Sequence, residues 1–191
     1  MTSPLAKRAF DLVLAVLLLA VLAVPMVIIV FLVRCTSRGP ALYWSQRVGR
    51  NNVLFRMPKF RTMHVGAPVV ATHLFTDPKR HVTRFGHILR VSSLDELPQL
   101  LSIVRGHMSF VGPRPALYNQ DDLVALRTER GVHVLTPGLT GWAQINGRDE
   151  LPIPQKVAYD AHYLTHRSFR FDLHVLWRTF TAVFSRHGVQ H

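Results

Sequence analysis

The stretch LVLAVLLLAVLAVPMVIIVFLV, residues 12–33, decides the fold class of this chain. It carries no charged residue, and as a helix it is long enough to cross a bilayer core about 30 Å thick. A cleaved signal peptide has a shorter apolar run followed by small residues, whereas Arg34-Cys35-Thr36-Ser37-Arg38 follows here. A soluble domain of 191 residues has too little core to surround such a helix. The stretch therefore predicts a membrane helix.

Two topologies are compatible with this membrane helix. Its flanks are basic on both sides, with Lys7 and Arg8 before it and Arg34, Arg38 and Arg47 after it. Because cytoplasmic flanks carry an excess of Lys and Arg, this pattern favours both ends on the cytoplasmic side. Pro25 removes a backbone hydrogen bond just past the middle, so a helix broken at Val24 and Pro25 would enter and leave by one face. A single span that kinks at Pro25 is the alternative, and the residues alone leave both open.

The composition indicates a small basic protein with an anionic partner. Lys and Arg number 23 against 11 Asp and Glu, a formal net charge of +12. Such an excess is typical of proteins that bind nucleic acid, phosphorylated substrates or anionic lipid, and the charge alone does not choose among these. Cys35 is the single cysteine, which excludes an internal disulfide and a cysteine metal cluster. The length suits one domain.

The rest of the chain predicts short strands and several helices. The expected elements are a turn at 37–40, strands at 41–44 and 53–60, an irregular loop at 64–82, helices from about Ser93 and over Asp121 to Arg130, and a turn at Pro137-Gly138. From Asp172 onward, apolar residues recur at spacings of three and four, at Leu173, Leu176, Trp177, Phe180, Val183 and Phe184. This stripe suits either core packing or a helix lying among lipid headgroups.

The segment SLDELPQL, residues 93–100, places two adjacent carboxylates at the start of a helix. Ser93 and Glu96 match a capping box, but Pro98 would then lack an amide that the helix needs. With Asp95 as the N-cap, Pro98 falls where the amide is unpaired anyway. In either arrangement the helix dipole favours the ionised carboxylates. An ionised Asp95 beside cations is a candidate nucleophile toward phosphorus or a magnesium ligand, and a plain helix cap is the alternative.

Basic runs around this segment supply a candidate phosphate site. The runs KFRTM (59–63), TRFGHILR (83–90) and VGPRP (111–115) contribute Lys59, Arg61, Arg84, Arg90 and Arg114. Each alone suits an ordinary solvated surface, but together they would cradle a diphosphate, since arginine forks match phosphate oxygens. The segment TPGLTGWAQINGR (136–148), which contains Gln144 and Arg148, has the composition of a binding loop.

In this order the segments resemble the bacterial sugar transferase family, the monotopic polyprenyl-phosphate phosphoglycosyl transferases. The segments that carry the resemblance are KRAFD (7–11), SRGPALYWSQRVGR (37–50), KFRTM (59–63), SLDELPQL (93–100), MSFVGPRP (108–115), PGLTGWAQINGR (137–148) and YDAHYL (159–164). Each alone is a weak signal, whereas their order along nearly the whole chain, from Lys7 to Phe184, is specific.

The resemblance implies a fold and a location. A re-entrant helix-break-helix anchor over residues 1–36 would hold a compact catalytic domain, residues 37–191, at the cytoplasmic face of the bacterial inner membrane. The fold would be an irregular α/β arrangement, mostly helical, with amphipathic surface helices against the membrane lipid. The resemblance also allows a homodimer.

The resemblance implies a two-step reaction as well. Asp95 and Glu96 map onto the family's catalytic dyad, and Asp95 and Asp172 are the expected ligands of Mg²⁺. Asp95 would attack the sugar-bearing phosphorus of a UDP-sugar and release UMP. Polyprenyl phosphate would then take the sugar phosphate from the aspartate, giving a polyprenyl diphosphosugar and starting a surface glycan or exopolysaccharide. The cations named above, with Gln144 and Arg148, would bind the substrate.

Two positions depart from the family pattern. Val24 stands where a serine usually precedes the proline, which would make the break shallower. His107 stands where the family has an acid, so either a metal ligand is lost or a loop cap is replaced by a comparable hydrogen bond; we favour the cap. The alternatives are an inactive member of the family and, from another class, a membrane-tethered nucleic-acid-binding protein. The arginines cluster beside carboxylates rather than in a basic stripe, which argues against nucleic acid.

Overall fold

The computed structural model describes residues 4–68, 81–147 and 151–184. This part of the chain is mostly helical with two two-stranded sheets, as the sequence predicts. The elements, in order, are α1 (Pro4–Thr36), β1 (Leu42–Val48), η1 (Arg50–Asn52), β2 (Leu54–Phe60), α3 (Arg84–Val91), η3 (Leu94–Gln99), α4 (Leu100–Val104), β3 (Ser109–Val111), α5 (Asp121–Glu129), η4 (Val132–Val134), β4 (Gly138–Thr140), α6 (Trp142–Ile145), α7 (Ile153–His166) and α8 (Phe169–Phe184). The sequence did not predict α3, α7 or the pairing of β3 with β4.

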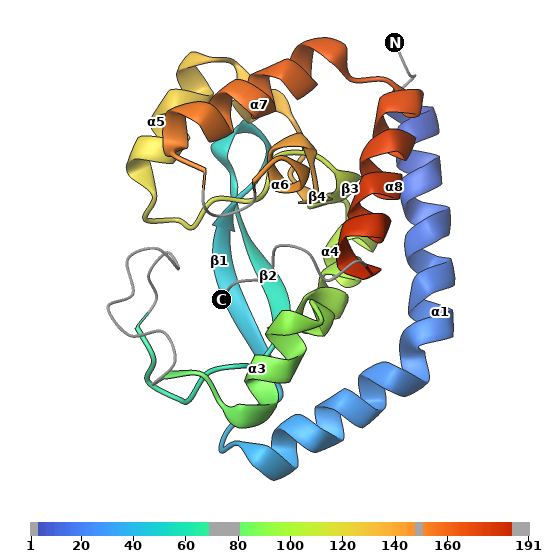
Figure 1. Cartoon of the computed structure of the whole chain (residues 1–191), viewed down its shortest axis with the longest axis vertical. Coiled ribbons are helices and arrows are strands. Elements are labelled where there is room, and N and C mark those ends of the chain that lie inside the picture. Colours follow the sequence, from blue (N-terminus) through green and yellow to red (C-terminus); the bar gives the residue numbers. More distant parts are fainter. Residues whose placement is uncertain (1–3, 69–80, 148–150, 185–191) are drawn as a thin grey trace.

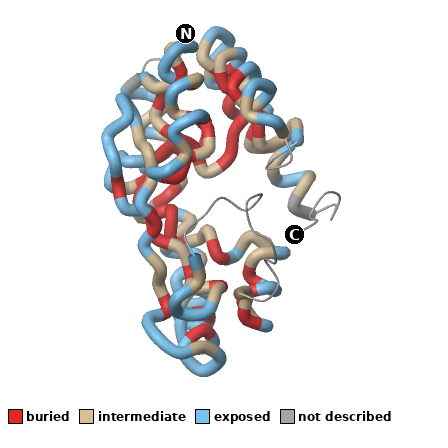
Figure 2. Tube along the Cα trace, turned by 90° about the vertical axis from the view of Figure 1, so that its left-hand side faces the viewer, coloured by how far each residue is buried: buried red, intermediate tan, exposed pale blue. Residues whose placement is uncertain are grey.

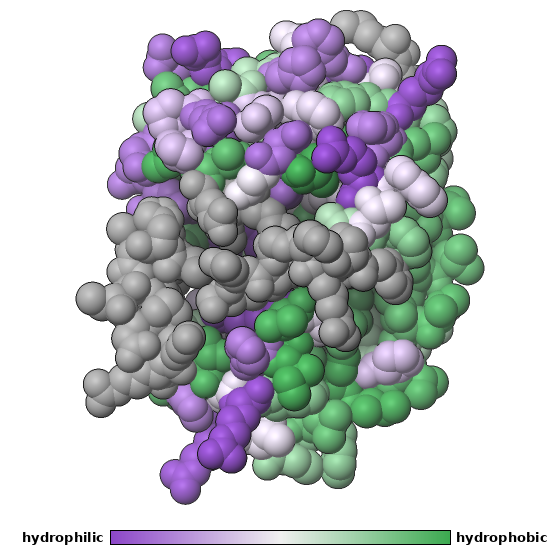
Figure 3. All heavy atoms as spheres, in the orientation of Figure 1, coloured by the Kyte–Doolittle hydropathy of each residue, from purple (hydrophilic) through white to green (hydrophobic). Residues whose placement is uncertain are grey.

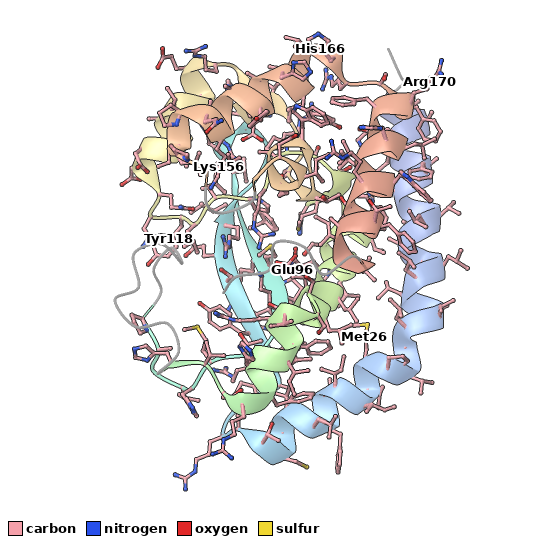
Figure 4. All side chains as sticks on the ribbon, in the orientation of Figure 1. Met26, Glu96, Tyr118, Lys156, His166 and Arg170 are labelled. Carbon is pink, nitrogen blue, oxygen red and sulfur yellow. The ribbon has the colours of Figure 1, made fainter. Side chains whose placement is uncertain are left out.

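Helix α1 runs along one side of the molecule and bends sharply before its last turns (Figure 1). Pro25 lies inside the helix, where the missing N–H and the clash with the preceding turn produce a kink. Met26, the next residue, sits at the bend (Figure 4). The break predicted at Val24 and Pro25 is therefore a bend within one continuous helix.

The two arms of α1 pack on separate parts of the core. Ala15 of the first arm is fully buried in the same cluster as Ile103 of α4. Val33 of the second arm packs in another cluster with Phe60 and Leu89. Buried positions accordingly lie on the inward sides of the elements (Figure 2). The bend allows one helix to cover both clusters.

The outer side of α1 is apolar and exposed. The helix is long and apolar enough to cross a membrane, and only 11% of its most apolar stretch is buried. Its outward residues are more than half exposed, namely Val13, Val16, Leu17, Val21, Val24, Val27, Ile28 and Phe31. Figure 3 shows hydrophobic atoms gathered along the edge of the molecule where α1 runs. Soluble monomers rarely expose a continuous apolar surface of this kind.

The β1–β2 hairpin carries Lys59 toward the centre of the molecule. Its strands are antiparallel, with Tyr43 opposite Lys59. Asn51 and Asn52 have positive φ angles of 54° and 59° at its turn, a conformation that asparagine tolerates. Strand β2 packs against η3, so the lysine meets the SLDELPQL segment.

Helices η3 and α4 form one helical run that begins beside Asp95 and Glu96. Ser93 precedes it in the left-handed conformation, with φ 59°, and its side chain caps no amide. The predicted capping box and the alternative N-cap at Asp95 are therefore both wrong. The first part of the run is a 3-10 helix, and Pro98 inside it has no N–H to donate. Both carboxylates do lie in the first turn, as predicted.

Strands β3 and β4 are parallel, with Ser109 opposite Gly138, and glycines let the chain cross itself beside them. A Cβ built on Gly138 would lie 2.1 Å from the nitrogen of Gly112, and one on Gly141 would lie 2.1 Å from the oxygen of Gly112. Only glycine fits such a close backbone approach. The crossing places α6, which follows Gly141, beside the loop that leads to Arg114.

Helix α8 turns most of its aromatic stripe outward. Val175 is fully buried, whereas Leu173, Trp177 and Phe180 are 44%, 66% and 55% exposed. Core packing is therefore the wrong interpretation for these three residues, while Leu176 packs against the core as a partly buried residue. The side chains of Val183 and Phe184, also predicted in the stripe, lie outside the described part. The exposed stripe suits the headgroup interpretation.

Candidate active site

Glu96 is held by two cations from different elements. It accepts a hydrogen bond of 2.7 Å from the Lys59 ammonium on β2 and another of 2.7 Å from the Arg114 guanidinium after β3. Burial alone would raise the pKa of Glu96, but the charges and hydrogen bonds of Arg114 and Lys59 hold that pKa well below its usual value. Figure 4 shows Glu96 near the middle of the molecule. Glu96 is thus a fixed anion that orients two cations.

Asp95 has a different environment from its neighbour. It is 8% exposed, and its nearest cation, the Lys59 ammonium, lies 3.9 Å from Oδ2. Among the interactions of the described residues, its carboxylate accepts no hydrogen bond. Burial raises the pKa of Asp95, an effect that Lys59 partly offsets and the charge of Glu96 reinforces. The Asp95 oxygens therefore remain available to an incoming group.

Arg90 completes a three-cation cluster around the dyad. Its Nε donates to the Thr62 hydroxyl at 2.9 Å. Burial lowers the pKa of Arg90, and the charge of Asp95 acts in the opposite direction. Lys59, Arg90 and Arg114 thus come together from β2, α3 and the loop after β3. Cations on several sides of a carboxylate pair suit a multiply charged phosphate ligand.

Two of the predicted cations point elsewhere. The Arg61 guanidinium donates to the Pro40 carbonyl at 2.8 Å, at the chain segment that follows α1. Arg84 is exposed at the first position of α3. Among the interactions of the described residues, neither side chain meets Asp95 or Glu96. The sequence could not separate Arg84 from Arg90, because the orientation of α3 decides which of the two faces inward. Arg61 follows β2, and its contact with Pro40 is likewise set by the fold.

Of the two predicted residues in the Gly-rich segment, one is described. Gln144 lies on α6, and both polar atoms of its amide are buried without a hydrogen-bond partner. Arg148 lies outside the described residues. Gln99 of the SLDELPQL segment, which the sequence did not single out, is 2% exposed, and its amide nitrogen is also unpartnered.

Asp172 lies at a junction of helices rather than beside the dyad. Its Oδ2 accepts from the Lys7 ammonium at 2.7 Å, and its Oδ1 accepts from the Tyr163 hydroxyl at 2.7 Å. Burial, and then the charge of Asp172, raises the pKa of Tyr163. Among the described interactions none links Asp172 with Asp95. The residue joins α1, α7 and α8, so its predicted place beside Asp95 in a metal site finds no counterpart in this geometry.

A buried ion pair supports the loop that carries Arg114. The Arg127 guanidinium donates to Asp160 at 2.7 Å and 3.0 Å and to the Arg114 carbonyl at 2.8 Å. The motif YDAHYL contains Asp160 and Tyr163, but its spacing gave no sign of these partners, because they come from distant parts of the chain.

The site offers a divalent metal few protein ligands. Among the described residues no group of three or more His, Cys, Asp and Glu side chains is arranged to hold a metal ion. Mg²⁺ is commonly bound through one or two carboxylates together with substrate phosphates. The Asp95 carboxylate, which accepts no hydrogen bond among the described residues, fits that role, whereas Glu96 already binds Lys59 and Arg114. Asp95 is thus the residue here that would hold Mg²⁺ with a bound diphosphate.

His107 lies at the other end of the helical run from Asp95. The His107 amide donates to the Ser102 carbonyl at 3.0 Å, and the helical rise from Asp95 to Ser102 is roughly 12 Å. The imidazole packs at 5.7 Å from the Phe55 ring. The loop-cap hydrogen bond expected of its side chain is absent among the described interactions, so that expectation is wrong. The position is nevertheless remote from the dyad.

Comparisons with known proteins identify the family of the chain. The family model described as "Bacterial sugar transferase" matches residues 2–186. The exopolysaccharide production protein ExoY of Sinorhizobium fredii is 36% identical over 94% of this chain and 85% of its own length. The undecaprenyl-phosphate glucose phosphotransferase of Komagataeibacter xylinus is 39% identical over 96% of this chain and 37% of its own. The UDP-glucose:undecaprenyl-phosphate glucose-1-phosphate transferase of Escherichia coli is 37% identical over 92% of this chain and 39% of its own.

The match covers nearly the whole chain, and it includes all the motifs on which the resemblance rests. The chain therefore belongs to the bacterial sugar transferase family, whose members are phosphoglycosyl transferases.

Proposed function

We propose that this protein transfers a sugar-1-phosphate from a UDP-sugar to a polyprenyl phosphate through a covalent phosphosugar on Asp95. The observation that carries the proposal is the Asp95 carboxylate, which is buried and lies 3.9 Å from the Lys59 ammonium. It accepts no hydrogen bond among the described residues, and the charges of Lys59, Arg114 and Arg90 act on it. An activated carboxylate next to a phosphate-binding cluster is suited to nucleophilic attack on phosphorus. The names of the Komagataeibacter and Escherichia relatives, which include undecaprenyl phosphate and UDP-glucose, support the two substrates.

The first step forms a bond between an Asp95 oxygen and the phosphorus that carries the sugar. The bond from that phosphorus to the bridging oxygen breaks, and UMP leaves with the electron pair. Lys59 and Arg114, which Glu96 fixes in place, neutralise the charge that develops on the phosphate oxygens. Glu96 itself is a poorer nucleophile, because two cations already occupy its oxygens.

In the second step Asp95 is the leaving group at the same phosphorus. An oxygen of the polyprenyl phosphate attacks, the bond to Asp95 breaks, and the carboxylate is regenerated. The product is a polyprenyl diphosphosugar, and charge balances in both steps without a net proton transfer. Mg²⁺ held by Asp95 and the substrate phosphates would supply further charge neutralisation. The lipid acceptor requires a site open to the membrane.

The apolar surfaces support a membrane-bound catalytic domain. The outer side of α1 and the exposed face of α8 are both apolar, and Lys7, Arg8, Arg34 and Arg38 flank the apolar part of α1. The positive-inside rule favours both ends on the cytoplasmic face of the inner membrane, and a bend at Pro25 would allow the helix to enter and leave by that face. This monotopic arrangement would leave Asp95 at the surface where soluble UDP-sugar meets lipid acceptor.

The proposal is tested by trapping the intermediate. Purified protein is incubated with each of a panel of UDP-sugars and Mg²⁺, without lipid acceptor, and its intact mass is measured. We expect the addition of one sugar phosphate with release of UMP, and loss of the adduct when undecaprenyl phosphate is added. Asp95→Asn should show no adduct. Turnover with lipid acceptor but no adduct in rapidly quenched samples would instead indicate direct transfer and refute the covalent step.

A further inference from the structure

Among the described residues, Gln144 is the side chain with two buried polar atoms that lack a hydrogen-bond partner, and the proposed reaction leaves them unexplained. Both its Oε1 and its Nε2 are buried, and neither has a hydrogen-bond partner in the part of the chain that the structure describes. Buried polar groups in folded proteins are nearly always paired, because an unpaired one loses its hydration without compensation. An amide whose oxygen and nitrogen are both unpaired is therefore energetically unfavourable, and a bound ligand could supply the missing hydrogen bonds.

The position of Gln144 connects it to the donor site. A Cβ built on Gly141 would lie 2.8 Å from Gln144 Oε1 and 2.1 Å from the Gly112 oxygen. The Gln144 amide oxygen and the Gly112 carbonyl therefore both pack closely against Gly141. Arg114 follows Gly112 by two residues and donates to Glu96 at 2.7 Å. The amide lies one short loop away from a cation of the active site.

We infer that Gln144 binds the uracil base of the nucleotide, an inference that rests on the proposed function. An amide presents one donor and one acceptor side by side in a plane. The imide edge of uracil offers the complement, with its N3–H beside a carbonyl oxygen, and enzymes commonly recognise bases through that edge. One planar contact would pair both atoms of the amide. Sugar hydroxyls could do so only through two separately placed groups.

The lack of partners also makes the side chain easy to move. Its two polar atoms are covered in this structure, so the nucleotide must meet an amide that has turned toward the site. Because no hydrogen bond holds the amide, this rotation breaks none. A neighbouring amide behaves differently, since Asn146 Nδ2 donates to the Trp142 carbonyl at 2.7 Å. Asn146 is thus a matched control on the same segment.

The test compares the binding of two ligands to two proteins, using the full-length chain in detergent and isothermal titration calorimetry. Wild type and Gln144→Met are each titrated with UMP and with 3-methyl-UMP, which lacks the N3–H donor. We expect Gln144→Met to weaken UMP binding about ten- to a hundredfold, the range of one bidentate base contact. The methyl group should weaken binding to wild type by a similar factor and should make little difference to the variant. Asn146→Met should bind UMP as wild type does.

Thermal unfolding gives a second, independent readout. Without nucleotide, Gln144→Met should melt about 2 °C or more above wild type, because an apolar side chain of similar size replaces an unpaired amide. A lower melting temperature would mean that the amide is paired internally in solution, for example by donating to the Gly112 carbonyl, and would overturn the inference.

Other outcomes separate this inference from the proposed function. Unchanged UMP binding with a raised KM for the UDP-sugar would assign the amide to the sugar and overturn its assignment to the base. Unchanged UMP binding and unchanged KM would mean that the amide holds only a buried water, which also overturns it. If wild type binds neither UMP nor any UDP-sugar of the panel, the proposed function itself is refuted, and this inference falls with it.

Discussion

At the scale of single residues, Asp95 and Glu96 show how adjacent carboxylates acquire different chemistry. They share a helix start, but Glu96 meets two cations at 2.7 Å, whereas Asp95 has its nearest cation at 3.9 Å. The pKa of one is lowered and that of the other is raised. Environments that separate the pKa values of neighbouring groups are typical of active sites.

Asp95→Asn should be inactive and yet more thermostable at neutral pH. Because the pKa of Asp95 is raised in the folded state, its contribution to stability is present at low pH and is lost as the pH rises through the carboxylate range. Removing the charge relieves that penalty. Melting temperatures at pH 7.5 and UMP release measure both effects, and the rate should fall by several orders of magnitude. A variant that keeps more than about a tenth of the rate is incompatible with a nucleophilic role.

Glu96→Gln should destabilise the protein in a pH-dependent way. Its pKa is lowered from 4.5 in the folded state, so its stabilisation is present above pH 4.5 and is lost as the pH falls below that value. The variant also leaves Lys59 and Arg114 without their anion. Urea unfolding should be measured at pH 7 and at successively lower pH. The difference between the free energies of unfolding of wild type and variant should become smaller as the pH falls. A difference in the free energy of unfolding that does not depend on pH would contradict the ion-pair explanation.

His107→Asp should leave the magnesium requirement unchanged. His107 packs beside Phe55, at the far end of η3 and α4 from Asp95, so an acid there would not reach a metal bound at the dyad. UMP release over a Mg²⁺ titration at pH 7.5 should give half-maximal concentrations within about twofold for the two proteins, because an oxygen ligand outside the coordination sphere adds little affinity. A tenfold drop would place residue 107 in the metal site.

At the scale of elements, α3 owes its position to a close contact with the strand segment before it. Thr83 caps the helix by accepting from the Gly86 amide at 2.9 Å, and its own amide donates to the Thr62 carbonyl at 2.9 Å. The Thr62 hydroxyl in turn accepts from Arg90. Contacts with Thr62 therefore position Thr83, Gly86 and Arg90 together.

Gly86→Ala should therefore reduce both stability and activity. Its Cβ would lie 2.1 Å from the Thr62 carbonyl oxygen, so α3 must shift and carry Arg90 away from Asp95. Overpacking of this kind costs about 1–3 kcal/mol. Chemical unfolding and the KM for the UDP-sugar report the two effects. The control is Ile88→Ala, on the exposed side of the same helix, which should change neither the stability nor the KM. A Gly86→Ala protein with the wild-type KM would show that the position of Arg90 does not depend on this contact.

At the scale of the whole molecule, the outer side of the bent α1 and the exposed residues of α8 form apolar surface, whereas the charges of the active site lie near the centre. Lys7 joins α1 to the core through Asp172, and Arg8 donates to the carbonyls of Ile103 and Val104 at the end of α4. The start of α1 is therefore part of the core rather than a separate tether.

Both ends of α1 should be on the cytoplasmic side of the membrane. Single cysteines at Thr2 and Thr36, in a Cys35→Ser background, are treated in intact cells with an impermeant thiol reagent. Neither should react until the cells are opened, because the basic flanks favour the cytoplasm. Labelling of residue 2 from outside would establish a single span and refute the re-entrant arrangement.

The sequence by itself determined the family, the apolar helix with its proline, and the paired carboxylates at a helix start. Each of these depends on the order and spacing of residues that are close together in the chain. It also predicted α5 and the two hairpin strands from turn signals and periodicity. Tertiary structure alone decided which cations reach the dyad. Arg90 turns inward and Arg84 outward only because α3 is fixed by its contact with Thr62.

Tertiary structure likewise decided the role of Asp172 and the orientation of the α8 stripe. The stripe has the same periodicity whether it faces protein or lipid. The packing of Val175 and the hydrogen bond between the Thr140 and Thr179 hydroxyls help to select the inward side. Asp172 meets Lys7 across most of the chain length, a contact that no local pattern encodes. Composition and spacing specify which groups are available, whereas long-range packing determines which of them meet.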